Sequence, residues 1–454
     1  MILNNIIFNS FSSKTVLIHC DHKRRDSGSA FLIAFFLRKL GYNTILGSRL
    51  TSKSLYYLFR PELVLLTHPG GLFTPEEMEE AAKHTVFVLL HPESSGMLKH
   101  AMIDHMRGGD ASIGNAYTKN ISKVFTWGEQ LKDWVVGAKL YPKESVEAIG
   151  CPRYDFYLDD SGHGSRSGLA MMSSFTGITT FDNRNVFLLL DQGRNLGGTY
   201  YSVKGGYEDL FWTSAAFARV YLEFLDIWCF DLKLPVHFRS YTLENFNDIL
   251  YFKEKYKPYL SLDKDTPFAG WLQKRGGNVF CYSSSVIESI ISKVPYICVQ
   301  GLIEERLEYH QPRKELIDVR GEIYDYTYKP KSMEEFVDLA KKANDGNLSL
   351  KASPSNSPKL KKILSDYFGY PKSEPSSFRL AKEIDALIRD RKKNNHKSFP
   401  MTRLMEYTRS CYNLALHLKP KMQKTLKDYH IMPWDRNDRA FAEEYFPKLE
   451  GITK

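Results

Sequence analysis

The sequence has no long uninterrupted hydrophobic run. Its most apolar stretch, AFLIAFFLRKL at residues 30–40, is broken by charge well before the roughly 18 residues that a membrane-spanning helix needs. The first residues also lack the charged, apolar and cleavage regions of a secretory signal peptide. We therefore expect a protein of the cytoplasm.

Cysteine is scarce, and the pattern typical of a metal site is missing. The six cysteines are scattered, with no CxxC pair and no histidine at zinc spacing. Buried thiols in a reducing compartment explain them best, so neither a disulfide framework nor a zinc site is expected. No metal site and no cofactor is predicted.

The chain is too long for a single core. At 454 residues, with 43% hydrophobic and 25% charged residues, it has the composition of a globular protein with two domains and an extension. The net charge of +9 is concentrated in one segment, because residues 379–428 hold thirteen Lys and Arg against five Asp and Glu. The positive charge is therefore a local feature of the C-terminal part.

Short apolar runs alternate with amphipathic stretches in the first third of the chain, and the alternation restarts later. This pattern predicts an α/β fold with parallel sheets covered on both faces. The predicted strands of the first part cover residues 14–20, 43–48, 62–68, 85–91, 123–128 and 145–150. Those of the second part cover residues 185–191, 235–240, 259–262, 278–282 and 294–299.

These patterns predict two Rossmann-like, doubly wound domains that face a cleft, followed by C-terminal helices. The predicted boundaries give an N-terminal domain at 1–157, a C-terminal domain at 186–375 and a basic helical extension at 376–454. Between the two domains, residues 158–185 are polar and rich in Gly and Ser, which is typical of a linker or mobile loop. Open parallel sheets bind ligands at the carboxyl ends of their strands, so we expect a ligand there.

Three serines stand where a predicted strand passes into a predicted helix, in NVFCYSSSVIESIISKVPYICV at residues 278–299. A helix N-terminus attracts phosphate, and Ser283, Ser284 and Ser285 would add hydroxyl donors there. Glu288 follows one turn later, within reach of a ribose diol. The same spacing is typical of a helix N-cap with a capping box. The two interpretations are compatible, and both stay open.

Two aspartates are candidate catalytic groups. Asp191 ends a predicted strand and begins a Gly-rich loop, where it could act as base or nucleophile or bind a donor hydroxyl. Asp26, in HKRRDSGS, could be a general base for an acceptor. Each has a structural alternative, a turn-forming residue for Asp191 and a helix N-cap for Asp26.

Other polar side chains are candidates for contact with an acceptor or an anion. Arg24 and Arg25 directly precede Asp26 and could hold an anionic group. His91 ends a predicted strand and is a candidate cleft residue, although a histidine in a loop is the common alternative. In the second part, Arg239 ends a strand and Glu244 opens the next helix.

Several of these motifs, in this order, resemble surface-carbohydrate-biosynthesis proteins with a GT-B-type glycosyltransferase fold, related to enzymes that use CMP-sugars or CDP-glycerol. That family has an Arg-Pro-His-Pro-x-Glu stretch, where this chain has Arg239 to Glu244 with Tyr-Thr in place of His-Pro. Its Asn/Ser-Ser-Thr-x-x-x-Glu stretch resembles Tyr282 to Glu288, which reads YSSSVIE. Similar segments are HKRRDSGSAFLIAFFLRKLGYNTILGSR, VFTWGEQLKDWV and SVEAIGCPRYDFY. SMEEFVDLAKKA and SEPSSFRLAKEIDAL resemble the family's closing helices, so the resemblance covers about residues 15–390.

The resemblance implies a metal-independent glycosyltransferase of bacterial surface polysaccharide synthesis (lipopolysaccharide or capsule), with the acceptor on the N-terminal domain and the nucleotide-sugar on the C-terminal domain. Arg194 and Arg239 could fork the carboxylate of an ulosonic acid, which favours CMP-Kdo or a related CMP-sugar as donor. The alternatives are a CDP-glycerol-type phosphotransferase, a nucleotide-sugar epimerase and a nucleotide-sugar-binding scaffold protein. The acceptor is expected to be a lipid-linked compound or an oligosaccharide.

The basic C-terminal segment has two interpretations. It could lie on the anionic inner face of the cytoplasmic membrane, where lipid-linked acceptors reside. Alternatively, its helices pack against the domains and leave a solvated outer face. Nucleic-acid binding is not expected, because the basic residues lack interleaved aromatics and match no known module.

Overall fold

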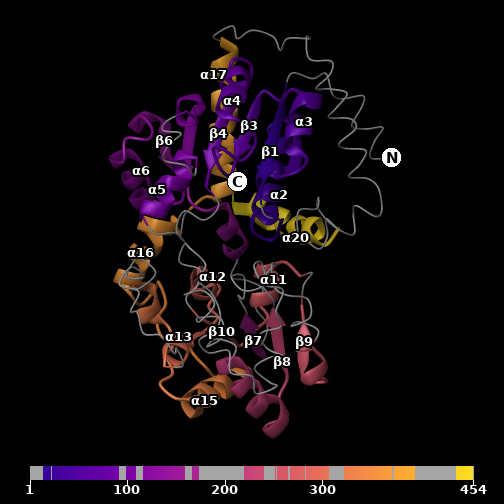
Figure 1. Cartoon of the computed structure of the whole chain (residues 1–454), viewed down its shortest axis with the longest axis vertical. Helices are drawn as coiled ribbons and strands as arrows, with labels where there is room; N and C mark the ends of the chain where they lie inside the picture. The colour runs from indigo at the N-terminus through magenta and orange to yellow at the C-terminus, as the bar shows by residue number, and fades with distance from the viewer. Residues whose placement is uncertain are drawn as a thin grey trace, which may run out of the picture. The chain divides into compact units, whose positions relative to one another are not determined.

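The structure is a computed structural model of the whole chain, shown in Figure 1. It describes residues 14–21, 23–91, 99–108, 116–158, 166–172, 219–239, 251, 253–263, 266–281, 283–305, 322–370, 373–393 and 436–452. The chain divides into two compact units. Unit 1 is Met1–Asp159 with Lys362–Lys454, and unit 2 is Asp160–Lys361.

Unit 1 contains a parallel six-stranded sheet in the order β2-β1-β3-β4-β5-β6. The strands are β1 (Thr15–Cys20), β2 (Asn43–Ser48), β3 (Leu63–Leu66), β4 (Val86–Leu90), β5 (Lys123–Thr126) and β6 (Val146–Ala148). All residues of β1, β3 and β4 are buried, as expected for strands covered on both faces. All six strands predicted for this part are therefore confirmed.

The strand order of unit 1 reverses direction at β1. From β1 the chain moves outward to β2, and it then returns to β3 on the other side of β1. The connections after β1 and β3 therefore leave the sheet in opposite directions. In doubly wound sheets this arrangement opens a crevice at the carboxyl ends of the two strands, the topological switch point.

The helices of unit 1 are α2 (Lys23–Lys39), α3 (Ser52–Phe59), α4 (Pro75–Ala82), α5 (Lys99–Arg107), α6 (Glu129–Gly137), α17 (Ser376–Lys393) and α20 (Arg436–Ile452), with 3-10 turns η2 (Thr118–Asn120), η3 (Lys143–Ser145) and η4 (Pro152–Tyr157). After α2, Gly41 has a φ of 88°, a left-handed conformation that glycine adopts without strain. α4 begins with a capping box between Thr74 and Glu77.

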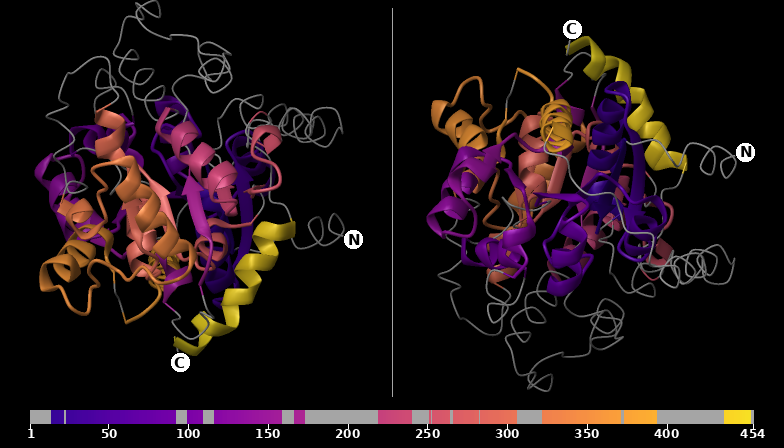
Figure 2. Two further views of the ribbon diagram at one scale, coloured as in Figure 1. Left: turned by 90° about the horizontal axis from the view of Figure 1, so that it is seen from below. Right: turned by 90° about the horizontal axis from the view of Figure 1, so that it is seen from above.

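The two described C-terminal helices pack against α2, and Figure 2 shows α20 running beside it. Phe378 of α17 contacts Phe36, and Phe446 of α20 stacks on Phe35 with ring centroids 4.0 Å apart. The 376–393 part of the predicted extension is thus a packing element. The basic residues at 397–427 lie outside the described residues, so contact of this segment with a membrane stays a prediction.

A buried carboxylate caps the first turn of α17. Asp155 accepts hydrogen bonds from the backbone N–H groups of Ser376 and Ser377, at 2.9 and 2.8 Å, and from the Ser377 hydroxyl at 2.5 Å. Asp155 belongs to the GCPRYD segment of the family resemblance. Its contacts give this segment a structural role, because they fix the start of α17 to the loop that follows β6.

Unit 2 contains a parallel five-stranded sheet in the order β11-β10-β7-β8-β9. The strands are β7 (Leu169–Met172), β8 (Val236–Arg239), β9 (Leu260–Leu262), β10 (Gly277–Phe280) and β11 (Tyr296–Cys298). Its helices are the π-helix η5 (Asp226–Asp231), α11 (Phe268–Leu272), α12 (Ser285–Ile291), α13 (Gln300–Glu304) and α15 (Met333–Asn344), with the 3-10 turn η7 (Tyr324–Tyr326). α16 (Pro358–Phe368) contains the boundary between the two units.

The prediction that residues 158–185 form a linker is wrong for part of that segment. Residues 169–172 form β7, the central strand of the second sheet, and Leu169, Ala170 and Met171 are fully buried. Pairing on both sides and burial on both faces stabilise this short strand although its neighbours in sequence are polar. The predicted strand at 185–191 lies outside the described residues. The other four strands predicted for this part are confirmed.

Both units are therefore parallel α/β units, and the predicted fold class is confirmed. None of the described helices is long and apolar enough to cross a membrane. The predicted roles of the domains, acceptor binding and donor binding, are not fixed by this architecture and stay predictions.

Candidate functional site

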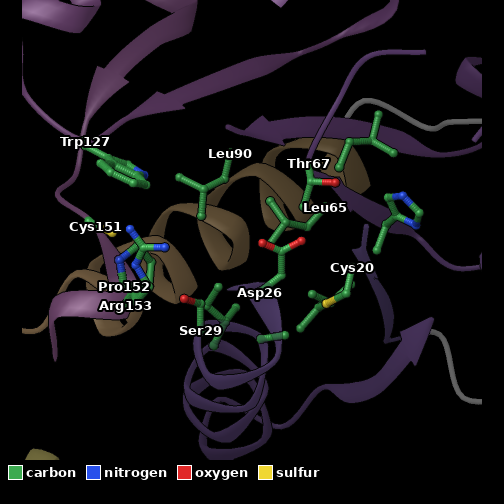
Figure 3. Close-up of a pocket in the computed structure, with 15 residues that line it drawn as sticks. Cys20, Asp26, Ser29, Leu65, Thr67, Leu90, Trp127, Cys151, Pro152 and Arg153 are labelled. Atoms are coloured by element: carbon green, nitrogen blue, oxygen red, sulfur yellow. The ribbon is translucent and has the colours of Figure 1, made fainter. Parts of the chain in front are cut away.

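A pocket lies at the topological switch point of unit 1, and Figure 3 shows the side chains that line it. Its wall is formed by the carboxyl ends of β1, β3 and β4, by the beginning of α2 and by the loops after β5 and β6. This is the place where the strand order predicts a crevice.

Asp26, a predicted catalytic residue, lies in this pocket. Its carboxylate points from the first turn of α2 toward the middle of the pocket, with Thr67 on one side and Arg153 on the other (Figure 3). The side chain is 5% exposed. Because α2 begins at Lys23, Asp26 lies inside the helix, three residues beyond its start. It therefore does not occupy the N-cap position that was the structural alternative.

His19 is a functional candidate that the sequence reasoning missed. It is 1% exposed, and its Nδ1 is 2.8 Å from the Ser52 hydroxyl. Its Nε2 has no hydrogen-bond partner among the described residues. Burial lowers the pKa of His19 to about 4, with the nearby carboxylates of Asp21 and Asp26 opposing the shift. The imidazole is thus neutral at pH 7, and a ligand atom could satisfy Nε2.

The Thr67 hydroxyl and the Arg153–Trp127 pair also line the pocket. The Thr67 hydroxyl is buried and has no hydrogen-bond partner within the described part of the chain. On the opposite side, the Arg153 guanidinium lies 5.5 Å from the centroid of the Trp127 ring. An aromatic wall, a cation, a carboxylate and a neutral imidazole together suit the apolar faces and hydroxyl groups of a sugar or polyol.

Three histidines lie next to the pocket at the same edge of the sheet. His68 is the second residue after β3 and His91 the first after β4. Both rings meet His105 of α5 edge to face, with centroids 5.4 and 5.5 Å away. The Gly70 N–H donates to Nδ1 of His68 at 3.1 Å, so a neutral His68 carries its proton on Nε2. Burial lowers the pKa of His68 to about 4. Among the described residues no group of His, Cys, Asp and Glu side chains is arranged to hold a metal ion.

His91, a predicted contact residue, is thus placed beside the pocket, and it is buried. The backbone of Arg24 and Arg25 lies in the first turn of α2, before Asp26, but their side chains are outside what the structure describes. Asp191, Arg194 and Glu244 also lie outside the described residues. The roles predicted for these residues stay predictions.

In unit 2, the turn with three serines is held by two buried tyrosines. The Tyr324 hydroxyl accepts a short hydrogen bond from the Ser283 N–H and donates to the Ser283 carbonyl at 2.7 Å. The Tyr296 hydroxyl donates to the Cys281 carbonyl at 2.6 Å. These contacts fix the backbone of the turn at the carboxyl end of β10.

The serines themselves form a local turn and no capping box. The Ser283 hydroxyl accepts from the Ser285 N–H at 3.2 Å, and the N-cap residue Ser284 makes no side-chain cap hydrogen bond within the described residues. Glu288 is buried, and α12 has seven residues. The capping-box alternative is therefore wrong, whereas contact of these residues with a nucleotide stays a prediction.

Arg239 lies at the end of β8, separated from β10 by β7, at the same edge of the sheet. It is 8% exposed, and its Nη1 donates to the Thr266 carbonyl at 2.7 Å and is 3.8 Å from the Asp263 carboxylate. Its guanidinium also lies 5.6 Å from the centroid of the Trp271 ring. These contacts give Arg239 a structural role inside unit 2.

The lowered pKa of His19 predicts how the stability of unit 1 depends on pH. The unfolded chain takes up the proton near pH 6.5 and the folded chain near pH 4, so the contribution of His19 is complete above pH 6.5 and is lost as the pH falls toward 4. The loss is at most about 3 kcal/mol. Urea unfolding between pH 4 and 8 measures it. His68 contributes in the same pH range, because burial also lowers its pKa to about 4, so His19→Gln should make this part of the profile less steep without removing its slope. An unchanged profile would show that His19 is not buried in the neutral form.

The tyrosine contacts predict a loss of stability in unit 2. Tyr324→Phe leaves the Ser283 N–H and carbonyl without this buried partner and should lower the free energy of unfolding by about 1–3 kcal/mol. Tyr328→Phe is the matched control, because the Tyr328 hydroxyl donates to the Ser349 carbonyl at an exposed position. Urea unfolding compares the two. Equal losses would contradict the proposed role of Tyr324 in holding the turn.

No protein-family model and no curated protein matches the chain. Among solved structures, a single-residue variant of the wall teichoic acid polymerase TagF is similar with a TM-score of 0.53 and 13% identity, over 85% of this chain and 91% of that one. The structure of the same variant soaked with CDPG for 15 minutes is similar with a TM-score of 0.51 and 13% identity, over 84% of this chain and 90% of that one.

The UDP-GlcNAc 2-epimerase of Methanocaldococcus jannaschii, in complex with UDP-GlcNAc and UDP, gives a TM-score of 0.47 and 9% identity, over 82% of this chain and 99% of that one. A score this low adds nothing to the argument. The similarity to TagF is one of fold, since the identity is low. The chain therefore has a GT-B-like fold built from two Rossmann-like α/β units.

Proposed function

We propose that the protein is a transferase that moves a sugar or a related group from a nucleotide-activated donor to a surface polysaccharide acceptor. The observation that carries the proposal is the pocket at the switch point of unit 1, where the buried polar side chains of Asp26, His19 and Thr67 lie opposite an Arg153–Trp127 pair. The GT-B-like fold and its similarity to a teichoic acid polymerase support this class of reaction.

On the acceptor side, the pocket offers a base for a hydroxyl nucleophile. The acceptor hydroxyl must lose its proton as it attacks the donor, and a carboxylate or a neutral imidazole can take it. Asp26 is the proposed base, as the sequence predicts. His19 is in the same pocket with its Nε2 available to a second hydroxyl, which would orient the acceptor. Arg24, Arg25 and His91 are proposed to contact an anionic group of the acceptor at this edge.

On the donor side, the proposed site is the carboxyl edge of unit 2. Ser283, Ser284, Ser285 and Glu288 would contact the nucleotide, with Arg194, Arg239 and Glu244 nearby and Asp191 as a second catalytic group. The Tyr296 and Tyr324 hydroxyls support this by holding the serine turn in one conformation. The contacts of Arg239 inside unit 2 give no support to its predicted grip on an ulosonic acid carboxylate.

The proposal for the donor is therefore limited to its nucleotide and does not name the transferred group. Two of the candidate donors share the cytidine nucleotide. One is a CMP-linked ulosonic acid such as Kdo, and the other is CDP-glycerol, the first alternative. We propose a cytidine nucleotide as the activating group and no metal ion in its binding, because the hydroxyl groups of the serine turn can donate to the phosphate.

A thermal-shift panel with CMP, CDP, UDP and GDP tests the donor side. A nucleotide at 100 times its Kd should stabilise the protein by about 2.7 kcal/mol, and only the cytidine nucleotides should do so. Ser284→Ala combined with Glu288→Gln should remove the shift. Ser349→Ala, an exposed serine of the same unit, should leave it unchanged.

Other outcomes of this panel and of a turnover assay would contradict the proposal. A shift with UDP alone would exclude the cytidine donors. An isomerised donor without any acceptor would identify an epimerase instead of a transferase. Binding of nucleotide with no turnover in the presence of oligosaccharide or lipid-linked acceptors would identify a binding protein without catalytic activity.

A further inference from the structure

We infer that the C-terminal helix α20 is a positioning element for the unit 1 pocket, acting through Tyr445, Phe156 and Gly28. None of the described residues that line the pocket belongs to α20. The inference depends on two successive contacts, which lead from Tyr445 of α20 to Phe156 and from Phe156 to Gly28 of α2, two residues from Asp26. It holds whether or not the pocket binds the acceptor proposed above.

The first contact joins α20 to the loop after β6. The rings of Tyr445 and Phe156 meet edge to face, with centroids 5.1 Å apart and an interplanar angle of 89°. Both residues are buried. Phe156 belongs to η4, the same turn in which Arg153 lines the pocket. α20 therefore covers the back of a turn whose other end forms part of the pocket wall.

The second contact joins Phe156 to α2. A Cβ atom on Gly28 would lie 2.8 Å from Cε2 of Phe156, which is too close for two carbon atoms. The Phe156 ring thus rests on the backbone of α2 at a position where only glycine leaves room. Gly28 lies between Asp26 and Ser29, which both line the pocket. The position of this ring consequently limits how far the first turn of α2 can move.

Two other contacts of α20 hold α2 further along the helix. Phe446 stacks on Phe35, and Lys39 donates to the Glu450 carboxylate at 2.9 Å. These contacts attach α20 to α2 away from the first turn. Tyr445 and Phe446 are neighbours on α20, so a substitution at one or the other separates pocket positioning from general attachment of the helix.

The test measures access to the pocket without any substrate. Cys20 and Cys151 line the pocket and are buried, whereas Cys229 and Cys298 are buried in unit 2. In the full-length protein, peptide mass spectrometry gives the labelling rate of each thiol with iodoacetamide. Tyr445→Ala should raise the rates at Cys20 and Cys151 about tenfold by increasing local opening, with Cys229 and Cys298 unchanged. Gly28→Ala should have the same effect, because its Cβ displaces Phe156.

Two controls make the outcome decisive. Tyr445→Phe keeps the ring and should label like the wild type, and Phe446→Ala should leave the pocket thiols within about twofold of the wild type. Tyr445→Leu is measured beside Tyr445→Ala, so that failure of the alanine variant to fold leaves the test intact. Equal labelling in the Tyr445→Leu and Phe446→Ala variants, or no increase in either Tyr445→Leu or Gly28→Ala, would overturn the inference. Neither result depends on the donor or acceptor, so it is separate from failure of the proposed function.

Discussion

The return of the chain across β1 is the constraint on which the candidate site depends. Because β2 and β3 lie on opposite sides of β1, the connections that leave the sheet there diverge, and a crevice opens at the carboxyl ends of β1 and β3. Ile18, His19 and Cys20 reach that crevice from one strand, and Leu65, Leu66 and Thr67 reach it from the other or directly after it. This topology brings the polar groups of the site close together.

α2 fixes the geometry of the site in this crevice. It brings Asp26 and Ser29 to the pocket, and its other faces are covered by the sheet, by α17 and by α20. The Asp155 carboxylate fixes the start of α17, and Phe156, the next residue, rests on Gly28. The loop after β6 therefore links the C-terminal helices to the first turn of α2. Such support is needed where a buried carboxylate and a neutral histidine must keep their positions.

Much of unit 1 could be predicted from the sequence. Its strands are continuous apolar runs flanked by helical patterns, and Asp26 follows such a run at the edge where ligands bind. His19 escaped notice because a single polar residue at the end of a strand has no pattern of its own. β7 was missed because four apolar residues stand in a segment rich in Gly and Ser. The bond from Tyr324 to Ser283 spans 41 residues, a separation at which no local spacing indicates contact.

The central role proposed for Asp26 is to activate an acceptor hydroxyl in this pocket. Release of nucleotide from a CMP- or CDP-activated donor, measured with and without oligosaccharide acceptors, tests it most directly in wild type, Asp26→Asn and the exposed-site control Asp104→Asn. We expect acceptor-dependent release that falls by at least about 100-fold in Asp26→Asn and is unchanged in Asp104→Asn. Release at the wild-type rate by Asp26→Asn, or release that does not depend on an acceptor, would contradict this role.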